Sequence, residues 1–338
     1  MDQSTGALEP VGKTTGVTNP SYLAVDPRRR YLYAVNELKM YEGKPSGSVS
    51  AFIIDPATGK PELLNRKPTH GTDPCHVVVD KTGRYVIISN FMSGSVCVLP
   101  IGEDGSLGDA TDFIQHHGSS IDPARQKGPH AHSVILDETN RYVFVPDLGL
   151  DQLVIYEFDP EHGKLRPKEE RWVRVKPGAG PRHFIFRPDG RYAYLINELD
   201  STCVAFLYDK DNAKLEEIQT VPTLPDGFLG QSTCAGVDVA PSGKYFYGSN
   251  RGHDSIVIYR IDQSTGRLSY VGHQSTQGKT PRHFSIDPTG RFLYAANQDT
   301  DTIVTFRIDP NTGKLQATGH VTEVPTPVCV LVVPQGDD

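Results

Sequence analysis

Three features of the sequence predict an all-β fold of the seven-bladed β-propeller class. A short turn recurs about every 50 residues, a second kind of turn alternates with it, and runs rich in β-branched and aromatic residues separate the two. Such runs, bounded by Asp and Gly turns, are typical of antiparallel strands joined by tight hairpins. Each repeat therefore holds four strands, and four-stranded repeats of this period are typical of propeller blades.

The first kind of turn joins the first and second strands of each blade. Its six copies are DPRRR (26–30), DKTGR (80–84), DETNR (137–141), RPDGR (187–191), APSGK (240–244) and DPTGR (287–291). Ten residues after each turn begins, the sequence has Asn36, Asn90, Asp147, Asn197, Asn250 or Asn297. This constant spacing indicates a shared structural role for the position. The blades are predicted to begin near Pro20, Pro74, Ala131, Pro181, Cys234, Pro281 and Pro327.

The second kind of turn joins the third and fourth strands, and it occurs seven times, first as DQSTGAL at 2–8. The sequence opens on this turn and closes on a run of the first-strand type at 327–334. We therefore expect one domain over 1–338 whose seventh blade is split between the termini. Its fourth strand is expected near 8–14, and its second and third strands are missing. Either the gene begins further upstream, or this blade is defective.

Composition narrows the class of protein. The 34 Lys and Arg against 41 Asp and Glu give a net charge of −7, which argues against a nucleic-acid phosphate binder. No apolar run reaches 18 residues, and the start has no signal-peptide pattern. The five Cys are scattered without a CxxC, which favours reduced thiols in the cytoplasm. The oligomeric state stays open.

Functional residues are sought where one blade departs from the others. Five positions before each first-type turn stand Ser21, Cys75, His132, Arg182, Ala235 and Arg282, and after the shared Asn or Asp stand Glu37, Phe91, Leu148, Glu198, Arg251 and Gln298. Both positions lie at the same end of an antiparallel hairpin, so they are expected to surround one mouth of the central channel. Charged groups that converge in a concavity favour a ligand site over a solvated rim, and the arginines favour an anion.

Other polar residues have simpler interpretations. His76, His183 and His283 share one repeat position and are expected to pack between blades. Asp147 could orient a histidine or bond backbone, and the backbone bond is favoured. His130 and His132 form an HxH pair in GPHAHSV, but no second pair accompanies them, so no metal site is predicted. His116 and His117 are expected to be exposed in a loop. No GxGxxG, Walker or GxSxG motif is present, so no nucleotide cofactor is predicted.

Several segments resemble the seven-bladed propeller lactonase family, which includes propeller-type 6-phosphogluconolactonases and fungal carboxy-cis,cis-muconate cyclases. They are HSVILDETNRYVFVPDLGLDQLVIYEFD, GAGPRHFIFRPDGRYAYLINELDS, NRGHDSIVIYRID and PRHFSIDPTGRFLYAANQ. The resemblance implies a catalytic set made of His132, Arg182, Glu198 and Arg251. Family members usually carry an extra strand pair before the DxxTGAL turn, which is absent here and would supply the two missing strands.

The resemblance implies hydrolysis of a small anionic sugar lactone, with 6-phospho-D-glucono-1,5-lactone as the leading candidate. His132 suits a general base, Arg182 and Arg251 suit an oxyanion, and Glu198 either orients an Arg or replaces His132 as the base. Arg282, Glu37 and His130 are expected to bind substrate. Two alternatives stay open at this point, namely the lactone-forming reaction of a carboxymuconate cyclase and a non-catalytic binding scaffold.

Overall fold

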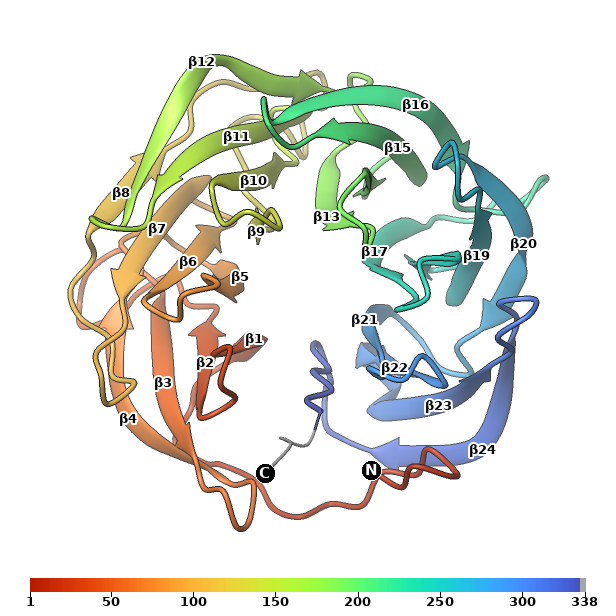
Figure 1. Cartoon of the computed structure of the whole chain (residues 1–338), viewed down its shortest axis with the longest axis horizontal. Helices are drawn as coiled ribbons and strands as arrows, with labels where there is room; N and C mark the ends of the chain where they lie inside the picture. Colours follow the sequence, from red (N-terminus) through yellow and green to blue (C-terminus); the bar gives the residue numbers. More distant parts are fainter. Residues whose placement is uncertain (335–338) are drawn as a thin grey trace. The chain divides into compact units, whose positions relative to one another are not determined.

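The computed structural model describes residues 1–334, and the side chains of all of them except 168–171. The chain forms two compact units, Val11–Pro181, here called the first unit, and Met1–Pro10 with Arg182–Asp338, here called the second unit. Figure 1 labels most of the strands, which form six four-stranded sheets within the described residues. In each sheet, strands that follow one another in sequence lie side by side. The all-β prediction with four-stranded antiparallel blades is confirmed.

The first unit contains three sheets. Their strands are β1 (Pro20–Val25), β2 (Tyr31–Asn36), β3 (Ser48–Ile54) and β4 (Pro61–Pro68); β5 (Pro74–Val79), β6 (Tyr85–Asn90), β7 (Ser95–Pro100) and β8 (Asp112–Gln115); and β9 (Ile135–Leu136), β10 (Tyr142–Asp147), β11 (Gln152–Asp159) and β12 (Lys164–Arg174). β9 has only two residues, and the chain also pairs with β10 further upstream, through an isolated bridge between Ala131 and Asp147.

The second unit contains the other three sheets. Their strands are β13 (Pro181–Phe186), β14 (Tyr192–Asn197), β15 (Thr202–Asp209) and β16 (Lys214–Pro222); β17 (Thr233–Val239), β18 (Tyr245–Arg251), β19 (Ser255–Ile261) and β20 (Leu268–Ser275); and β21 (Pro281–Ile286), β22 (Phe292–Asn297), β23 (Thr302–Ile308) and β24 (Leu315–Glu323). A short 3-10 helix, η1 (Gln298–Thr300), follows β22. The predicted starts of six blades agree with these bounds to within a residue or a bridge.

The second strand of each sheet is buried on both faces, because neighbouring sheets within a unit pack against each other. Every residue of β6, β14 and β22 is buried. In the second unit, Tyr247, Leu293 and Phe306 belong to one core cluster between two such sheets. This packing explains why these strands are almost continuously apolar rather than alternating.

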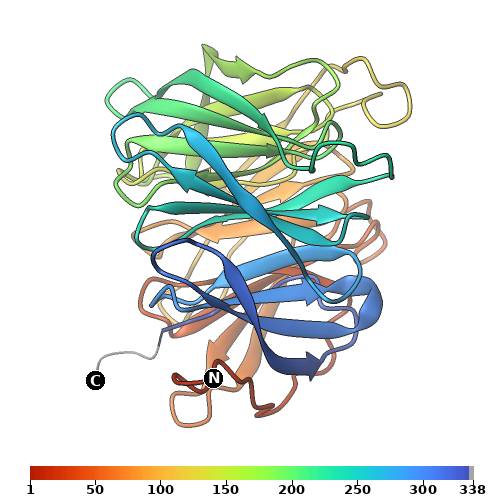
Figure 2. The same cartoon turned by 90° about the vertical axis from the view of Figure 1, so that its right-hand side faces the viewer.

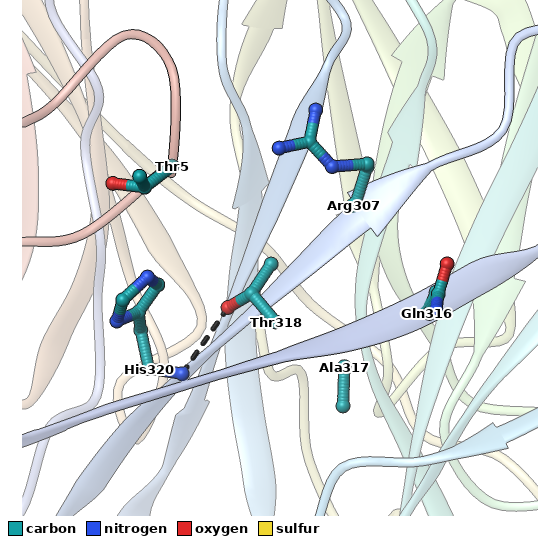
Figure 3. Close-up of a pocket in the computed structure, with 6 residues that line it drawn as sticks. All are labelled: Thr5, Arg307, Gln316, Ala317, Thr318 and His320. Carbon is teal, nitrogen blue, oxygen red and sulfur yellow. Dashed lines mark hydrogen bonds between the residues drawn. The ribbon is translucent and has the colours of Figure 1, made fainter.

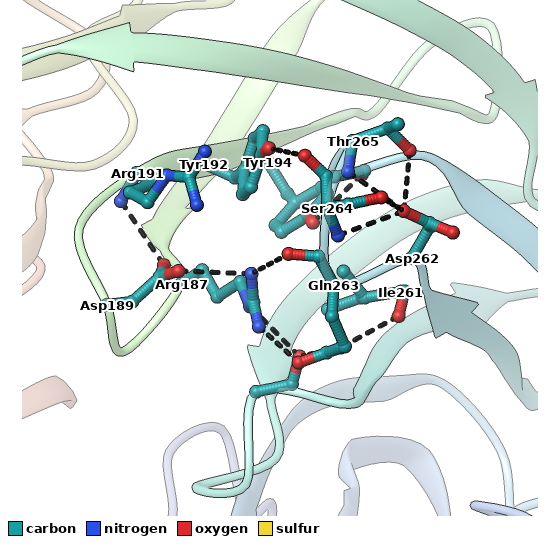
Figure 4. Close-up of polar contacts among 12 residues, drawn as sticks. Arg187, Asp189, Arg191, Tyr192, Tyr194, Ile261, Asp262, Gln263, Ser264 and Thr265 are labelled. Atoms are coloured by element: carbon teal, nitrogen blue, oxygen red, sulfur yellow. Dashed lines mark hydrogen bonds and ion pairs between the residues drawn. The ribbon is translucent and has the colours of Figure 1, made fainter.

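The first residue of each first-type turn closes that turn when it is Asp. Asp80 Oδ1, for example, accepts from the backbone N–H groups of Arg84 at 2.8 Å and Tyr85 at 2.9 Å. Arg187 replaces this Asp in the fourth blade and reaches out of the turn instead (Figure 4). Its guanidinium group donates to the Gly243 carbonyl oxygen at 3.1 Å and also contacts Gln263. The departure thus ties two neighbouring sheets together, which is a structural role.

The N-terminal turn packs on the last sheet as the other second-type turns pack on their neighbours (Figure 2). The Tyr294 hydroxyl donates to the Gly6 carbonyl oxygen at 3.1 Å, and Tyr247 donates to Gly313 in the same way at 2.9 Å. Leu8 packs against the cluster that contains Phe292 and Tyr294. The turn predicted at 2–8 therefore keeps its place in the repeat.

The prediction of strands at 8–14 and 327–334 is wrong, since neither range contains a strand in the structure. The register of the C-terminal run is nevertheless that of a first strand. The Val330 N–H donates to His283 Nδ1 at 3.3 Å, which repeats the bond from the Val134 N–H to His76 Nδ1 at 3.4 Å. Within residues 1–334, no second and third strands lie beside these two runs, so they have no ladder of hydrogen bonds to join.

Candidate active site

The central group of the candidate site is Glu198, which directly follows β14 in the second unit. Its Oε2 atom accepts from Arg182 Nε at 3.0 Å. Arg182 is the second residue of β13, and only 2% of its surface is exposed. Its NH1 group also donates to the Ala235 carbonyl oxygen on β17 at 2.6 Å. A buried guanidinium group is thus paired by one carboxylate and one carbonyl, as a buried charge requires.

Arg251, the last residue of β18, approaches the same carboxylate oxygen from the neighbouring sheet. Its NH2 group lies 2.8 Å from Glu198 Oε2 and donates to the Cys234 carbonyl oxygen at 2.8 Å. The backbone adds a further link, because the Cys234 N–H donates to the Glu198 carbonyl at 3.2 Å. The Arg251 Nε–H group is buried and has no hydrogen-bond partner among the described residues. One oxygen atom therefore fixes two guanidinium groups, and one of them keeps an unused donor.

The positive charge around this group extends to β21. Burial and then the charges of Arg182 and Arg282 lower the pKa of His283 to about 3. His283 is therefore neutral at physiological pH, and its Nδ1 atom is already occupied by the Val330 N–H. With the histidine neutral, the charges of Arg182, Arg251 and Arg282 favour an anionic ligand.

The fourth predicted catalytic residue, His132, lies in the first unit, between the Ala131 bridge and β9. It is buried, and its ring meets the Phe91 ring edge-on at a centroid distance of 5.2 Å. Its Nδ1 atom lies 3.9 Å from Cys75 Sγ, and its backbone N–H donates to the Pro146 carbonyl at 2.9 Å. The structure thus brings three of the four predicted residues together, and the approach of His132 to them stays a prediction.

Two of the predicted substrate-binding residues also belong to the first unit. The His130 ring stacks on Phe91 at a centroid distance of 4.7 Å, and its Nδ1 atom lies 3.0 Å from the Phe91 carbonyl oxygen. Glu37 follows β2, and its backbone N–H donates to the Asn19 carbonyl at 3.0 Å. Phe91 follows the shared Asn in its blade, as Glu198 does in the fourth blade. Its packing against the rings of His130 and His132 was not predicted.

Two further predictions about polar residues need correction. His116 was expected to be exposed, but it is buried and lies 2.6 Å from Asp147 through Nδ1, whereas His117 is exposed. For Asp147, a backbone bond was favoured over the orientation of a histidine, but its carboxylate does both. The connector between the second and third sheets of the first unit folds back on β10, which removes His116 from solvent.

A separate hollow of about 320 Å³ lies where the N-terminal turn meets β23 and β24 (Figure 3). It is lined by Thr5, Arg307, Gln316, Ala317, Thr318 and His320. The Arg307 NH2 group already donates to the Ser4 carbonyl oxygen at 2.8 Å, and the guanidinium group lies over the Phe292 ring. These contacts assign Arg307 to packing of the N-terminal turn rather than to a ligand.

Comparison with known proteins identifies the family. The family described as "Lactonase, 7-bladed beta-propeller" matches residues 1–332. The chain belongs to this family. A 6-phosphogluconolactonase of Bacillus subtilis (strain 168) is 36% identical over 287 residues, which cover 85% of this chain and 79% of the relative. A 6-phosphogluconolactonase of Formosa agariphila is 35% identical over 291 residues, which cover 85% of this chain and 80% of the relative.

A solved structure adds to the comparison of this lactonase-family chain. The periplasmic gluconolactonase of Pseudomonas aeruginosa superposes with a TM-score of 0.90 at 33% identity, covering 96% of this chain and 91% of that chain. Among the described residues, no group of three or more His, Cys, Asp and Glu side chains is placed to hold a metal ion. No described helix is long and apolar enough to cross a membrane.

Proposed function

We propose that this enzyme hydrolyses 6-phospho-D-glucono-1,5-lactone to 6-phosphogluconate, as the names of its relatives suggest. The observation that carries the proposal is the pair of guanidinium groups fixed on Glu198 Oε2, with the buried Arg251 Nε–H group left without a partner among the described residues. A buried, unused donor beside a preorganised positive charge is suited to the oxyanion that forms when a lactone carbonyl is attacked.

Hydrolysis requires a water that loses a proton as it attacks the lactone carbonyl. In our proposal, His132 takes this proton, and Arg182 and Arg251 stabilise the tetrahedral oxyanion. The carbonyl re-forms as the bond to the ring oxygen breaks, and that oxygen takes up the proton from His132, so the products are the open hydroxyl and a carboxylic acid, which releases its remaining proton to solvent as the carboxylate. The water supplies both the new carbonyl-bound oxygen and the proton that the leaving oxygen gains.

Glu198 is best assigned as the positioning residue of the two arginines. Its Oε2 atom accepts a hydrogen bond from Arg182 and forms an ion pair with Arg251, so this carboxylate is fixed by both arginines. The oxygen that would have to take a proton from water is already in contact with two guanidinium groups. This argument supports His132 rather than Glu198 as the base.

The substrate phosphate is assigned to Arg282, because the charge of this residue adds to that of Arg182 around His283. Guanidinium groups bind phosphate oxygens bidentately, and a neutral histidine does not repel or neutralise the pair. His130 and Glu37 are assigned to the hydroxyl groups of the sugar, which suits an imidazole and a carboxylate that can both form hydrogen bonds.

The decisive experiment measures the disappearance of 6-phosphogluconolactone with purified protein against the spontaneous rate. Gluconolactone without phosphate tests the assigned anion site, and a carboxylated cis,cis-muconate tests the lactone-forming reaction. We expect acceleration of the phosphorylated lactone and a higher KM for the unphosphorylated one. Acceleration of the muconate reaction alone would replace hydrolysis by cyclisation as the function, and binding of phosphosugars without turnover of any lactone would leave a binding scaffold.

Two finer points complete the proposal. We assign residues 1–10 and 324–334 to a seventh blade, which is supported by the contacts of Gly6 and Val330 in the register of the repeat. We also place the activity in the cytoplasm, where the five cysteines, none of which forms a disulfide among the described residues, stay reduced.

A further inference from the structure

A repeated latch fixes the connector that leads into most blades. The side-chain amide of the shared Asn donates to the carbonyl oxygen of a connector Thr. The four such pairs are Asn36 with Thr18, Asn90 with Thr69, Asn250 with Thr223, and Asn297 with Thr276, at 2.8–3.3 Å. In three of these connectors, the Thr N–H donates to the residue just before the third strand of the preceding sheet, as from Thr69 to Gly47.

The third blade replaces both members of this latch with ionisable residues. The His116 N–H donates to the Gly94 carbonyl at 3.0 Å, so His116 occupies the Thr position, and Asp147 occupies the Asn position. His116 Nδ1 lies 2.6 Å from Asp147 Oδ2, and His116 Nε2 lies 2.6 Å from the Tyr156 hydroxyl. All three side chains are buried. A neutral amide contact has therefore become a buried Asp–His–Tyr chain.

The direction of the protons in this chain follows from Tyr156. Burial, followed by the charge of Asp147, raises the pKa of Tyr156 above its ordinary value, so the hydroxyl keeps its proton. The hydroxyl can then donate to His116 Nε2, and the Nδ1–H group of the ring can donate to the Asp147 carboxylate. The Tyr156 hydroxyl thus orients the His116 ring, and the ring in turn orients the Asp147 carboxylate.

The oriented carboxylate holds the segment that carries both predicted site histidines. Asp147 Oδ1 accepts from the backbone N–H groups of His130 at 2.7 Å and Gly149 at 3.0 Å. The Leu148 N–H donates to the His130 carbonyl at 2.9 Å. Gly149 must lack a side chain here, because a Cβ would lie 1.9 Å from the Gly128 carbonyl oxygen. Among the described residues, none of the shared Asn side chains accepts a hydrogen bond from the backbone N–H group of the residue just before its own blade.

We propose that Asp147 and His116 are positioning residues of the active site, which set the backbone of His130 and, two residues later, the ring of His132. This inference rests on the proposed function, since it assigns a catalytic consequence to a segment that would otherwise be structural. The connector 117–130 contains no strand, so no ladder of backbone hydrogen bonds fixes it. The bond from the His130 N–H group to the Asp147 carboxylate fixes its end instead. In blades whose connector carries no predicted site histidine, the hydrogen bond from the shared Asn to the connector Thr is enough to hold the connector.

The test compares Asp147→Asn with the double variant His116→Thr/Asp147→Asn, which rebuilds the latch found in the other blades. The matched control is Asn297→Ala, which breaks the corresponding latch in the last sheet. The readouts are kcat/KM for 6-phosphogluconolactone, the melting temperature, and the NMR signals of the His130 and His132 rings, assigned with single His→Gln variants. Wild type should also show a low-field ring N–H proton from His116, which disappears in Asp147→Asn.

We expect Asp147→Asn to lower kcat/KM about tenfold to hundredfold and to shift both ring signals, because small misplacements of reacting groups are costly. The double variant should recover most of this loss, and Asn297→Ala should lower the melting temperature alone. If Asp147→Asn does not fold, Tyr156→Phe should give a smaller shift in the same signals. Unchanged ring signals and kcat/KM in a folded Asp147→Asn would overturn the inference. If wild type hydrolyses no lactone, the proposed function fails, and the ring signals still decide whether the pair positions the segment.

Discussion

Arg182 Nε and Arg251 NH2 lie 3.0 and 2.8 Å from the same atom, Glu198 Oε2, although the two arginines come from different sheets. Each arginine also donates to a backbone carbonyl of β17, from Arg182 to Ala235 and from Arg251 to Cys234. The guanidinium planes are therefore fixed before any ligand binds. Preorganised donors of this kind stabilise a developing oxyanion without the cost of reorientation.

Replacing Arg182 should damage both activity and stability. Arg182→Ala is expected to lower kcat about 10²–10³-fold, the usual effect of removing one oxyanion donor. Removal of one partner of a buried ion pair costs about 3–5 kcal/mol, with Arg251 retained on Glu198 to soften that loss. Chemical denaturation and lactone hydrolysis measure the two effects. Normal stability of Arg182→Ala would contradict the buried geometry described above.

Glu198→Gln separates positioning from base catalysis. Gln keeps an acceptor oxygen but loses the charge that holds two guanidinium groups. A positioning role predicts a loss in kcat together with a fall in the melting temperature, and the remaining activity should keep the pH profile of wild type. Loss of the acidic limb of that profile, with unchanged stability, would instead assign the base to Glu198.

His132→Gln tests the assigned base. The variant should lower kcat about 10²–10⁴-fold, the usual contribution of a general base, while KM changes little because the phosphate is held elsewhere. His132→Gln also keeps a side chain that can fill the space beside Phe91 and Cys75. Full turnover in this variant would show that the water is activated by another group.

His283 predicts a pH dependence of stability. Its folded pKa of about 3 lies below the ordinary value of 6.5, so the folded state binds fewer protons than the unfolded state between these values. The free energy of unfolding should therefore be highest above pH 6.5 and should fall as the pH drops toward 3. His283→Gln should reduce this slope, as measured by denaturation at a series of pH values. An unchanged slope would place the acid sensitivity in other groups.

The repeat made much of the fold predictable, because each blade served as a control for the others. The turn at 80–84 and the Asn at 90 predicted β5, β6 and the hairpin between them at the right residues. The C-terminal run was misjudged for a physical reason. Val330 has the side-chain pattern and the inter-blade bond of a first strand, but a strand also requires a neighbour with which to pair.

The candidate site was predictable as a set of residues but not as a set of contacts. The spacing placed Arg182, Glu198 and Arg251 at one end of neighbouring sheets, where the structure has them. Nothing in the spacing indicated that Arg182 would be buried, or that backbone carbonyls of β17 would accept from both arginines. The partnership of His116 with Asp147 was equally hidden, because the connectors that lead into the blades differ in length, so the spacing of the repeat does not align His116 with the threonines of the other connectors.

Phe292→Tyr should stabilise the protein, since Phe292 breaks a pattern that four other sheets keep. Tyr31, Tyr85, Tyr192 and Tyr245 occupy the corresponding position, and the hydroxyl of each donates to a backbone carbonyl of the neighbouring second-type turn. The N-terminal turn packs on the last sheet in the same register, so a hydroxyl on residue 292 should reach the carbonyl of Ser4. One added hydrogen bond contributes about 0.5–1.5 kcal/mol, which denaturation of the purified variant can measure. Tyr294→Phe, which removes the bond to Gly6, is the matched control and should lower stability by a similar amount. If Phe292→Tyr is destabilising while Tyr294→Phe behaves as expected, the carbonyl of Ser4 is already saturated by Arg307.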